Sequence, residues 1–408
     1  MAFGDSPHDA SLREAWTQFC TRLQAAGDKV FKDHNPANPL QRADAWRFLT
    51  QNLSQAFDLA LETRDTRFPV LHRFCGPHRK LGSDAADFAY IQAWIDGDSA
   101  YKIAGNTGTA RFLNFTVQGP RAEILPSGLT NLHEPFGDVP EANLFGHEMT
   151  VDPDGGFELY IGGPERGPNW LPTTPGTRKL FIRQGFDRWD ETPATMRIER
   201  VDIAEPRPLP TPTEMIEAID WAGDFMTGLM RDWPDFMFRY PATSSGPDNP
   251  NVFPRIALDG ADQKRGRAAV NMHWRLGADE ALIIEFVPPE TFWMFSNMGS
   301  FANSMDYLYR PVSYTPSRAT VDGDGKVRLI LAHDDPGYHN WLDTQGFELG
   351  NTTYRNLLGG ETAIETRVVK RADLASALPA DSAKVTPQER VAQLRARFDG
   401  IRRQRYGL

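Results

Sequence analysis

The apolar positions along this chain follow two periods, one helical and one of β-strand type. In residues 9–26 they recur every three or four positions, which predicts an amphipathic helix. A similar stripe predicts a second helix over 40–62, and we expect the two helices to pair as a hairpin across the loop KDHNPANP. From about 100 to 202 the apolar positions alternate between Gly-rich turns instead, which predicts strands.

Two stretches of this β-type region read as β-hairpins. Apolar and polar residues alternate on both sides of a turn with two glycines in AYKIAGNTGTARFLNFTVQG (100–119). NLFGHEMTVDPDGGFELYIGG (143–163) centres on Asp154-Gly155-Gly156, residue types that accept the positive φ of a tight turn. Each stretch is therefore expected to form two paired strands.

Two later helices begin with the same signal. Thr211 is the expected N-cap, Pro212 the first helical residue and Glu214 the partner that completes a capping box. The same three residue types recur at positions 386, 387 and 389. The proline-rich connector EPRPLPTPTE leads into the first of these helices, and further alternating segments lie between the two.

Helices at the start, middle and end of the chain, with strands between them, do not alternate as βαβ units would. This order predicts an α+β fold with an antiparallel β-sandwich-like core, an N-terminal helical hairpin, a central helix and a C-terminal helix. The expected division is an N-terminal helical region, a first β-rich region, a linker with its helix, and a C-terminal β-rich domain that ends in a helix. A single integrated unit is the alternative. The boundaries are 1–98, 99–204, 205–235 and 236–408.

Composition narrows the class of protein. The net charge of −10 gives no basic field for a nucleic-acid partner. No apolar run reaches about 18 residues and the N-terminus lacks a signal-peptide pattern, so we expect a cytoplasmic protein without a membrane partner. Phosphate-loop, dinucleotide and HExxH motifs do not occur, which predicts that no cofactor is bound. The sequence is compatible with both a monomer and a homo-oligomer.

The densest group of reactive side chains is HDDPGYHNWLDTQG (333–346), which follows the apolar stretch KVRLILA. In a functional interpretation Asp335 is a general acid or base and His339 shares or orients its proton. Asn340 binds an oxygen of the substrate and Trp341 stacks on its ring. In the structural interpretation the Pro-Gly pair is only a turn and the tryptophan fills the core.

A second candidate stretch is RQGFDRWDETP (183–193). Here Arg183 and Trp189 are candidate substrate contacts, and Asp187 is a candidate second carboxylate that divides the acid and base roles with the first. Trp293, in a segment rich in aromatic residues and Met, is a third ring for the same pocket. Structural Arg–Asp salt bridges are the alternative reading of this stretch.

Two stretches of the chain resemble a known bacterial family, the DUF 1214 domain family. DDPGYHNWLDTQGFELG is similar to the family's Asp-Pro-Gly-x-x-Asn-Trp-Leu-Asp-Thr-x-Gly pattern, and KLGSDAADFAYIQAWIDGDSAYKIAGNTGTARFLNFTV is similar to its N-terminal block. Ala85-Ala86-Asp87 departs from the usual Asn-Pro-Asp of that block. The resemblance implies a soluble, catabolic-type protein with a β-rich core and supplies no reaction.

The leading hypothesis is a cofactor-independent acid/base enzyme, a hydrolase or lyase, that acts on a saccharide or ring-containing small molecule in bacterial catabolism. One alternative is a non-catalytic protein that binds a carbohydrate or a lipid-like molecule in a Trp-rich cleft. Another is a metal-dependent enzyme that uses His333 and His339.

Overall fold

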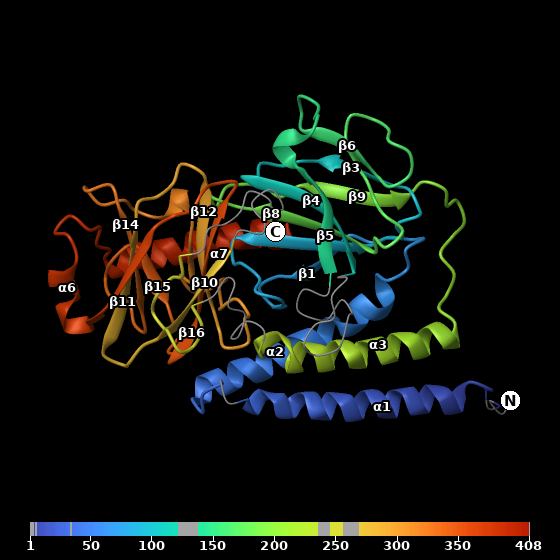
Figure 1. The fold of residues 1–408 in the computed structure, drawn as a ribbon, viewed down its shortest axis with the longest axis horizontal. Coiled ribbons are helices and arrows are strands. Elements are labelled where there is room, and N and C mark those ends of the chain that lie inside the picture. The colour runs from blue at the N-terminus through green and yellow to red at the C-terminus, as the bar shows by residue number, and fades with distance from the viewer. Residues whose placement is uncertain are drawn as a thin grey trace.

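The computed structural model describes residues 4, 6–32, 35–120, 138–235, 245–255 and 269–407. Two β-sandwiches stand side by side, and a layer of helices covers one face of the first (Figure 1). The fold is α+β with a sheet-rich core, N-terminal helices and a C-terminal helix, as the order of elements predicted. None of the helices in these ranges is both long and apolar enough to cross a bilayer.

The helical layer combines the N-terminal helices with the central one. The first two helices meet through the rings of Phe19 and Phe57, whose centroids are 5.4 Å apart. The central helix runs alongside the first, and Arg22 donates to Asp220 and Asp224 across this contact at 2.5 and 2.9 Å. Both N-terminal helices pack mainly on the central helix, so the three form one layer. The elements are α1 (Asp9–Asp28), η1 (Lys29–Phe31), α2 (Pro39–Phe57), η2 (Asp58–Glu62) and α3 (Pro212–Arg231).

Both predicted capping boxes are confirmed. The Thr211 hydroxyl accepts from Glu214 N at 3.3 Å, and Glu214 Oε2 accepts from Thr211 N at 2.6 Å. The same pair of bonds joins Thr386 and Glu389 at 3.3 and 2.7 Å, where α7 (Pro387–Tyr406) begins. Each box provides acceptors for two backbone N–H groups at the helix start, where no preceding helical turn supplies a carbonyl.

The first sandwich packs a five-stranded sheet on a four-stranded one. Its core joins apolar side chains such as Phe115 and Ile182 of the larger sheet to Ile103 and Leu159 of the smaller. The opposite face of the larger sheet packs on the helical layer. The larger sheet has the order β1 (His72–Cys75), β2 (Phe88–Trp94), β8 (Lys179–Gly185), β4 (Phe112–Pro120), β5 (Asp138–Phe145), and the smaller one β7 (Trp170–Leu171), β6 (Gly156–Ile161), β3 (Tyr101–Asn106), β9 (Thr195–Arg200).

Both predicted hairpins are wrong in their pairing. β3 and β4 flank the first predicted turn, but β3 pairs with β6 and β9, whereas β4 pairs with β5 and β8. The turn at Asp154-Gly155-Gly156 exists, with Gly155 at φ +85°, yet it leads from η3 (Gly146–Glu148) into β6 of the other sheet. Turn chemistry marks where the chain reverses, but it does not decide whether the next strand joins the same sheet.

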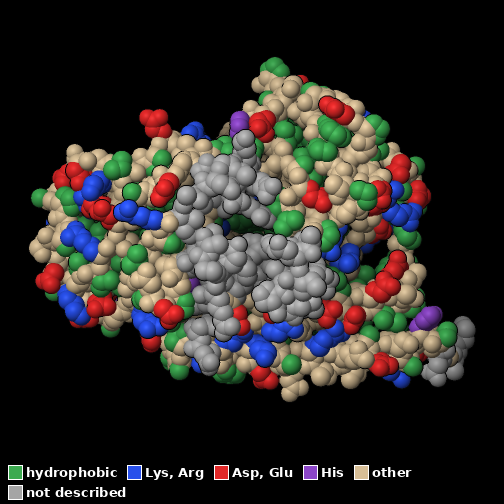
Figure 2. Space-filling model, in the orientation of Figure 1, with side chains coloured by type: hydrophobic (Ala, Val, Ile, Leu, Met, Phe, Trp, Pro, Cys, Tyr) green, Lys and Arg blue, Asp and Glu red, His purple; other side chains and the backbone are tan. Residues whose placement is uncertain are grey.

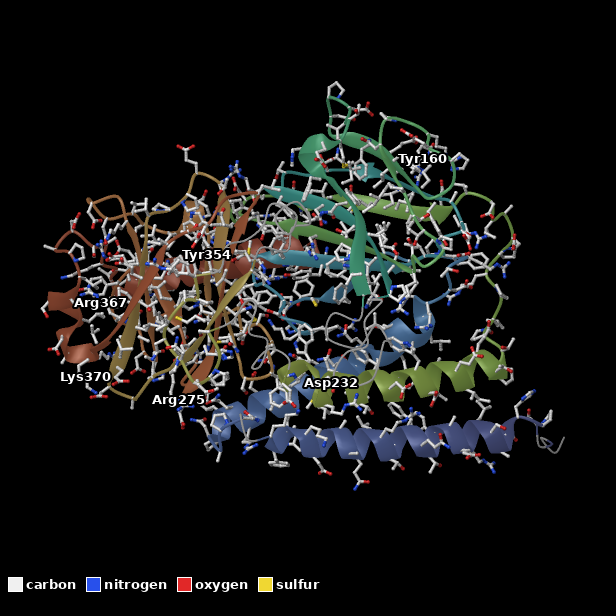
Figure 3. The ribbon with its side chains drawn as sticks, viewed as in Figure 1. Tyr160, Asp232, Arg275, Tyr354, Arg367 and Lys370 are labelled. Atoms are coloured by element: carbon white, nitrogen blue, oxygen red, sulfur yellow. The ribbon has the colours of Figure 1, made fainter. Side chains whose placement is uncertain are left out.

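The second sandwich is formed by two four-stranded sheets. Tyr354, 2% exposed, lies inside it, whereas Tyr160 of β6 lies on the outer sheet of the first sandwich (Figure 3). The short helix α6 (Leu374–Ala377), with η5 (Arg371–Asp373), covers the outer face. One sheet has the order β10 (Val270–Arg275), β16 (Leu349–Leu357), β12 (Phe292–Met298), β13 (Ser313–Tyr314), and the other β15 (Trp341–Asp343), β14 (Val327–Ala332), β11 (Glu280–Phe286), β17 (Ile364–Lys370).

Candidate functional site

Asp335 of the first candidate loop is held by the C-terminal helix. Arg390 of α7 donates to both of its carboxylate oxygens, at 2.9 and 3.1 Å, and Asp335 Oδ1 also accepts from Gly337 N at 2.9 Å. Arg390 is 5% exposed, while the Asp335 side chain is 36% exposed. A carboxylate in a two-pronged pair with a buried guanidinium is fixed in place, so these contacts are those of a tether between loop and helix.

His339 is engaged on both its ring and its backbone. Ring atom Nε2 lies 3.1 Å from the carbonyl of Arg318, and the backbone carbonyl of His339 accepts from the Tyr314 hydroxyl at 2.5 Å. His333, the other histidine of the loop, lies within 2.7 Å of the Thr344 hydroxyl and 3.2 Å of the Gly277 carbonyl. Both imidazoles therefore already have hydrogen-bond partners.

Asn340 and Trp341 are anchors of the second sandwich. The Asn340 amide accepts from Thr320 N and the Thr320 hydroxyl and donates to the carbonyls of Thr320 and Arg328, all within 3.1 Å. Trp341 is 8% exposed and its indole N–H donates to Ala332 O at 3.0 Å. With their polar atoms satisfied by the protein itself, neither side chain offers a free group to a substrate.

The second candidate loop ends against the turn η4 (Pro316–Arg318). Asp187 accepts from both the backbone N and the hydroxyl of Ser317, at 2.9 and 2.6 Å. Trp189 lies between two guanidinium groups, those of Arg318 and Arg397, at 4.1 and 5.0 Å from its ring centroid. The ring stack predicted for a substrate is thus made with two cations of the protein.

Two other predicted substrate contacts lie elsewhere. Trp293 is 1% exposed in the core of the second sandwich, where its ring meets Phe286 edge-on at 5.0 Å. Arg183 points from β8 toward the helical layer, 3.5 Å from Asn114 Oδ1, with its guanidinium 4.6 Å from the Phe181 ring centroid. These residues do not share one cavity with the 333–343 loop among the described residues.

The two loops nevertheless approach the same turn. Asp187 binds Ser317, and His339 binds the carbonyl of the next residue, Arg318. A small pocket beside the turn is lined by Tyr338 and Asn340 and by no residue of 183–193. The hydrogen bonds and ring contacts of these side chains are those of structural residues. Their catalytic and binding roles stay predictions.

A different group of ionisable residues is buried at the junction of the two sandwiches. Ser304 Oγ donates to Asp84 Oδ2 at 2.6 Å and accepts from Lys80 Nζ at 2.8 Å, while Ser304 N donates to Asp84 Oδ1 at 3.0 Å. The three residues are 1–2% exposed. A hydroxyl is thereby held between an amine and a carboxylate from a segment about 220 positions away.

Burial shifts the titration of this trio. It lowers the pKa of the Lys80 ammonium to about 8, against the opposing charge of Asp84, and it raises the pKa of Asp84. Burial disfavours the charged form of each group, which explains both directions. The Lys80 amine also lies 3.6 Å from the ring centroid of Tyr307.

Both backbone segments that carry the trio contain a residue in the left-handed region. Ser83 has φ +59° and Ala302 has φ +53°, and Ser83 N donates to Ala302 O at 2.9 Å. Residues with a Cβ adopt this region at an energetic cost, and such residues are concentrated at functional sites.

A second buried cluster surrounds Asp87, on the same segment. Arg318 Nη2 lies 2.7 Å from Asp87 Oδ1, and the Ser313 hydroxyl donates to that oxygen at 3.1 Å. Arg397 and Arg405 of α7 also reach this cluster, where Arg397 donates to Ser313 O at 2.7 Å and Arg405 to Ala86 O at 2.9 Å. α7 is therefore attached to the junction mainly by guanidinium groups.

Neither cluster was identified from the sequence. The stretch KLGSDAADF did carry a signal, because it places a lysine, a serine and two aspartates within eight positions, directly before the residues that form β2. Their partners, Ser304 and the arginines of α7, lie more than 200 positions away and only the fold brings them close. Within the ranges that the structure covers, no three His, Cys, Asp or Glu side chains are grouped to hold a metal ion.

On the face shown in Figure 2, acidic and basic side chains are intermixed and form no basic stripe. The ionisable groups of the junction are buried and form no part of this surface.

Comparison with known proteins gives a fold relative and a partial family match. The crystal structure of an uncharacterised protein from Burkholderia cenocepacia is similar, with 29% identity, a TM-score of 0.77, and coverage of 89% of this chain and 99% of that one. The VPA0106 protein from Vibrio parahaemolyticus is 12% identical over 80% of this chain and 98% of that one. Its TM-score of 0.42 does not show a shared fold. No curated protein matches.

The family described as "Protein of unknown function (DUF1214)" matches residues 89–184, which run from β2 through β8 of the first sandwich. The C-terminal block around 334–350 lies outside the matched range, so its resemblance stays a prediction. Residues 89–184 are therefore similar to the DUF1214 family, as the N-terminal block of the resemblance predicted.

Proposed function

We propose that the protein is a cofactor-independent acid–base hydrolase for a small, ring-containing molecule, and that Ser304 is its nucleophile. The observation that carries the proposal is the hydrogen-bonded order Lys80–Ser304–Asp84, with 2.8 and 2.6 Å between successive atoms. A nucleophile within hydrogen-bond reach of a base, itself near a third group, is the arrangement that acyl transfer requires. The acid–base chemistry expected from the 333–343 loop is thus proposed at the junction instead.

The roles follow from the protonation states. With its pKa near 8, Lys80 is neutral in a fraction of molecules at pH 7 and in most at pH 9. When the amine is neutral, the Ser304 hydroxyl turns its proton from Asp84 Oδ2 to Lys80 Nζ. The amine takes that proton as Ser304 Oγ attacks the carbonyl carbon, and it returns the proton to the leaving alcohol or amine. Water then hydrolyses the acyl group from Ser304. Asp84, bonded to Ser304 N, positions the hydroxyl.

Burial restricts access to this site. Ser304 is 1% exposed, so the proposal includes an outward movement of residues 299–305 before a substrate reaches it. The left-handed conformation of Ala302 in this segment costs about 1 kcal/mol or more, and an opened state would release it. The movement required also favours small substrates over large ones.

A fluorophosphonate probe tests the proposal without knowledge of the substrate. Nucleophilic attack by Ser304 would expel fluoride and leave a phosphonylated serine, which peptide mass spectrometry locates. We expect labelling of Ser304 that accelerates with pH through about 8 and falls at least 100-fold in Lys80→Met. Ser300→Ala is the matched control, because Ser300 is a buried serine of the same segment that donates to Asn35 instead. A folded protein that takes no label at Ser304 at pH 9 would refute the proposal.

A non-catalytic binding protein is the second candidate, and one observation favours it. On the face of β16 opposite Tyr354, both polar atoms of the fully buried Asn351 and the Nη1 of Arg355 have no hydrogen-bond partner among the described residues. Buried polar groups normally have partners, so these atoms suit a polar ligand held between sheet and helices.

A thermal-shift screen of saccharides and ring-containing acids separates the two candidates. A ligand of this face should stabilise the wild type and lose its effect in Arg355→Met. Arg275→Met is the control, since Arg275 ends β10 on the exposed side (Figure 3). Retention of the shift in Arg355→Met would exclude this site.

A further inference from the structure

The cluster around Asp87 contains more positive charge than its protein partners balance. Three arginines of the cluster are buried, each less than one-tenth exposed: Arg318, Arg397 and Arg405. Among the described residues, Asp87 is the one carboxylate that forms an ion pair with any of them. Burial lowers the pKa of both Arg397 and Arg405 to about 10, with repulsion from Arg318 contributing. Guanidinium groups resist deprotonation, so the excess charge persists at neutral pH.

Several hydrogen-bonding atoms of the same cluster have no partner within the described residues. They are Arg318 Nη1, the Nε and Nη1 of Arg405, and one acceptor, Asp87 Oδ2. The aromatic contacts of the cluster, Arg405 with Phe186 at 4.6 Å and Arg318 with Trp189 at 4.1 Å, occupy only the flat faces of the guanidinium groups. The free donors lie on the edges of the guanidinium groups, beside Arg318 Nη2 and Arg405 Nη2, which do have partners.

Water and an anion would meet these needs differently. Ordered water satisfies donors and acceptors but leaves the charge excess, and an unpaired buried ion costs several kcal/mol. An oxyanion accepts hydrogen bonds from the guanidinium edges and balances the charge as well. The free acceptor Asp87 Oδ2 adds a second requirement, because it needs a ligand that can also donate.

We infer that Arg318, Arg405 and Asp87 form a binding site for hydrogen phosphate beneath helix α7. Hydrogen phosphate has oxygens for the three N–H donors and one O–H for Asp87 Oδ2. Sulfate at neutral pH has the oxygens without the O–H, so the carboxylate repels it. This site is independent of the Ser304 proposal and serves to bind an anion and fasten α7 to the first sandwich.

Thermal unfolding at constant ionic strength and pH 7.5 tests the site. Inorganic phosphate should raise the Tm of the wild type in a saturable manner, by about 5 °C at high occupancy, whereas sulfate and chloride should not. Methyl phosphate is a parallel arm, because its second pKa of about 6 leaves it without an O–H at this pH, and it should therefore fail to stabilise, as sulfate does. Phosphorus NMR of inorganic phosphate gives an independent reading, through line broadening in the presence of the protein.

Variants assign the effect to the cluster. Arg405→Met should abolish the shift with phosphate, and Asp87→Asn should allow sulfate to stabilise as well as phosphate does. Arg395→Met, an exposed arginine of the same helix, should behave as the wild type. Equal shifts with phosphate and sulfate in the wild type, or no shift with either, would overturn the inference even if the cluster variants fail to fold.

Discussion

Replacement of Asn340 by alanine is the sharpest test of how the 333–343 loop is used. The amide makes four hydrogen bonds, to the N, hydroxyl and carbonyl of Thr320 and to the carbonyl of Arg328, at 2.8–3.1 Å. Asn340→Ala leaves three backbone groups without this partner. Each buried group that loses its hydrogen bond costs about 1–3 kcal/mol, and Thr320 is only half-buried, so water can recover part of that loss.

The expected decrease in the free energy of unfolding is therefore about 3–5 kcal/mol, a large part of the stability of an ordinary domain. Urea unfolding followed by tryptophan fluorescence measures it, and Asn249→Ala at an exposed position should change the value by less than about 0.5 kcal/mol. A double-mutant cycle with Thr320→Ala should give a coupling energy of at least about 1 kcal/mol. A loss below about 1 kcal/mol for Asn340→Ala would show that the described hydrogen bonds do not stabilise the fold and would return this residue to the list of candidate ligand contacts.

Three other variants follow from the same structure. The folded-state pKa of Lys80 is about 8 and its ordinary value is 10.5, so the unfolded chain binds more protons than the folded one between these pH values. In urea titrations, the stability of the wild type relative to the double variant Lys80→Met/Asp84→Asn should therefore rise by about 2 kcal/mol from pH 7 to 9.5. A difference that does not change with pH would contradict the effect of burial on the Lys80 pKa. Gly400→Ala places a Cβ 2.7 Å from the Trp189 ring and should cost about 1–3 kcal/mol in thermal unfolding, whereas Gly360→Ala, in open space, should not. Asp335→Asn removes the charged partner of the buried Arg390 and should lower stability by about 1–3 kcal/mol. Unchanged stability together with loss of turnover would instead support its predicted catalytic role.

Local signals in the sequence were sufficient for the helices and the fold class. The Thr-Pro-x-Glu starts at 211 and 386 predicted the capping boxes correctly, because both partners of each bond lie within four positions. Strand pairing was not predictable in the same way. β3 and β4 alternate as paired strands would, but each has one face in the same core, and alternation is identical whether two strands share a sheet or face each other across a sandwich.

The candidate site shows the same limit on a larger scale. The loop at 333–343 was correctly recognised as dense in polar groups, but density of polar residues does not distinguish a reactive loop from one whose polar atoms bind each other. Asp335 and Asn340 are of the second kind in their contacts. Lys80 and Ser304 were missed because neither residue type is unusual in its own neighbourhood and their meeting depends on the placement of the two sandwiches.

The attachment of α7 also bears on how the chain is made. Arg405 donates to Ala86 O, a partner 319 positions earlier, so the ribosome must add most of the polypeptide before this contact can form. At about 5–20 residues per second, Asp87 and Phe186 of the first sandwich wait for about ten seconds to about a minute without the arginines that cover them. During that interval the nascent protein presents an acidic and aromatic edge, and chaperones that recognise such surfaces have a defined period in which to act.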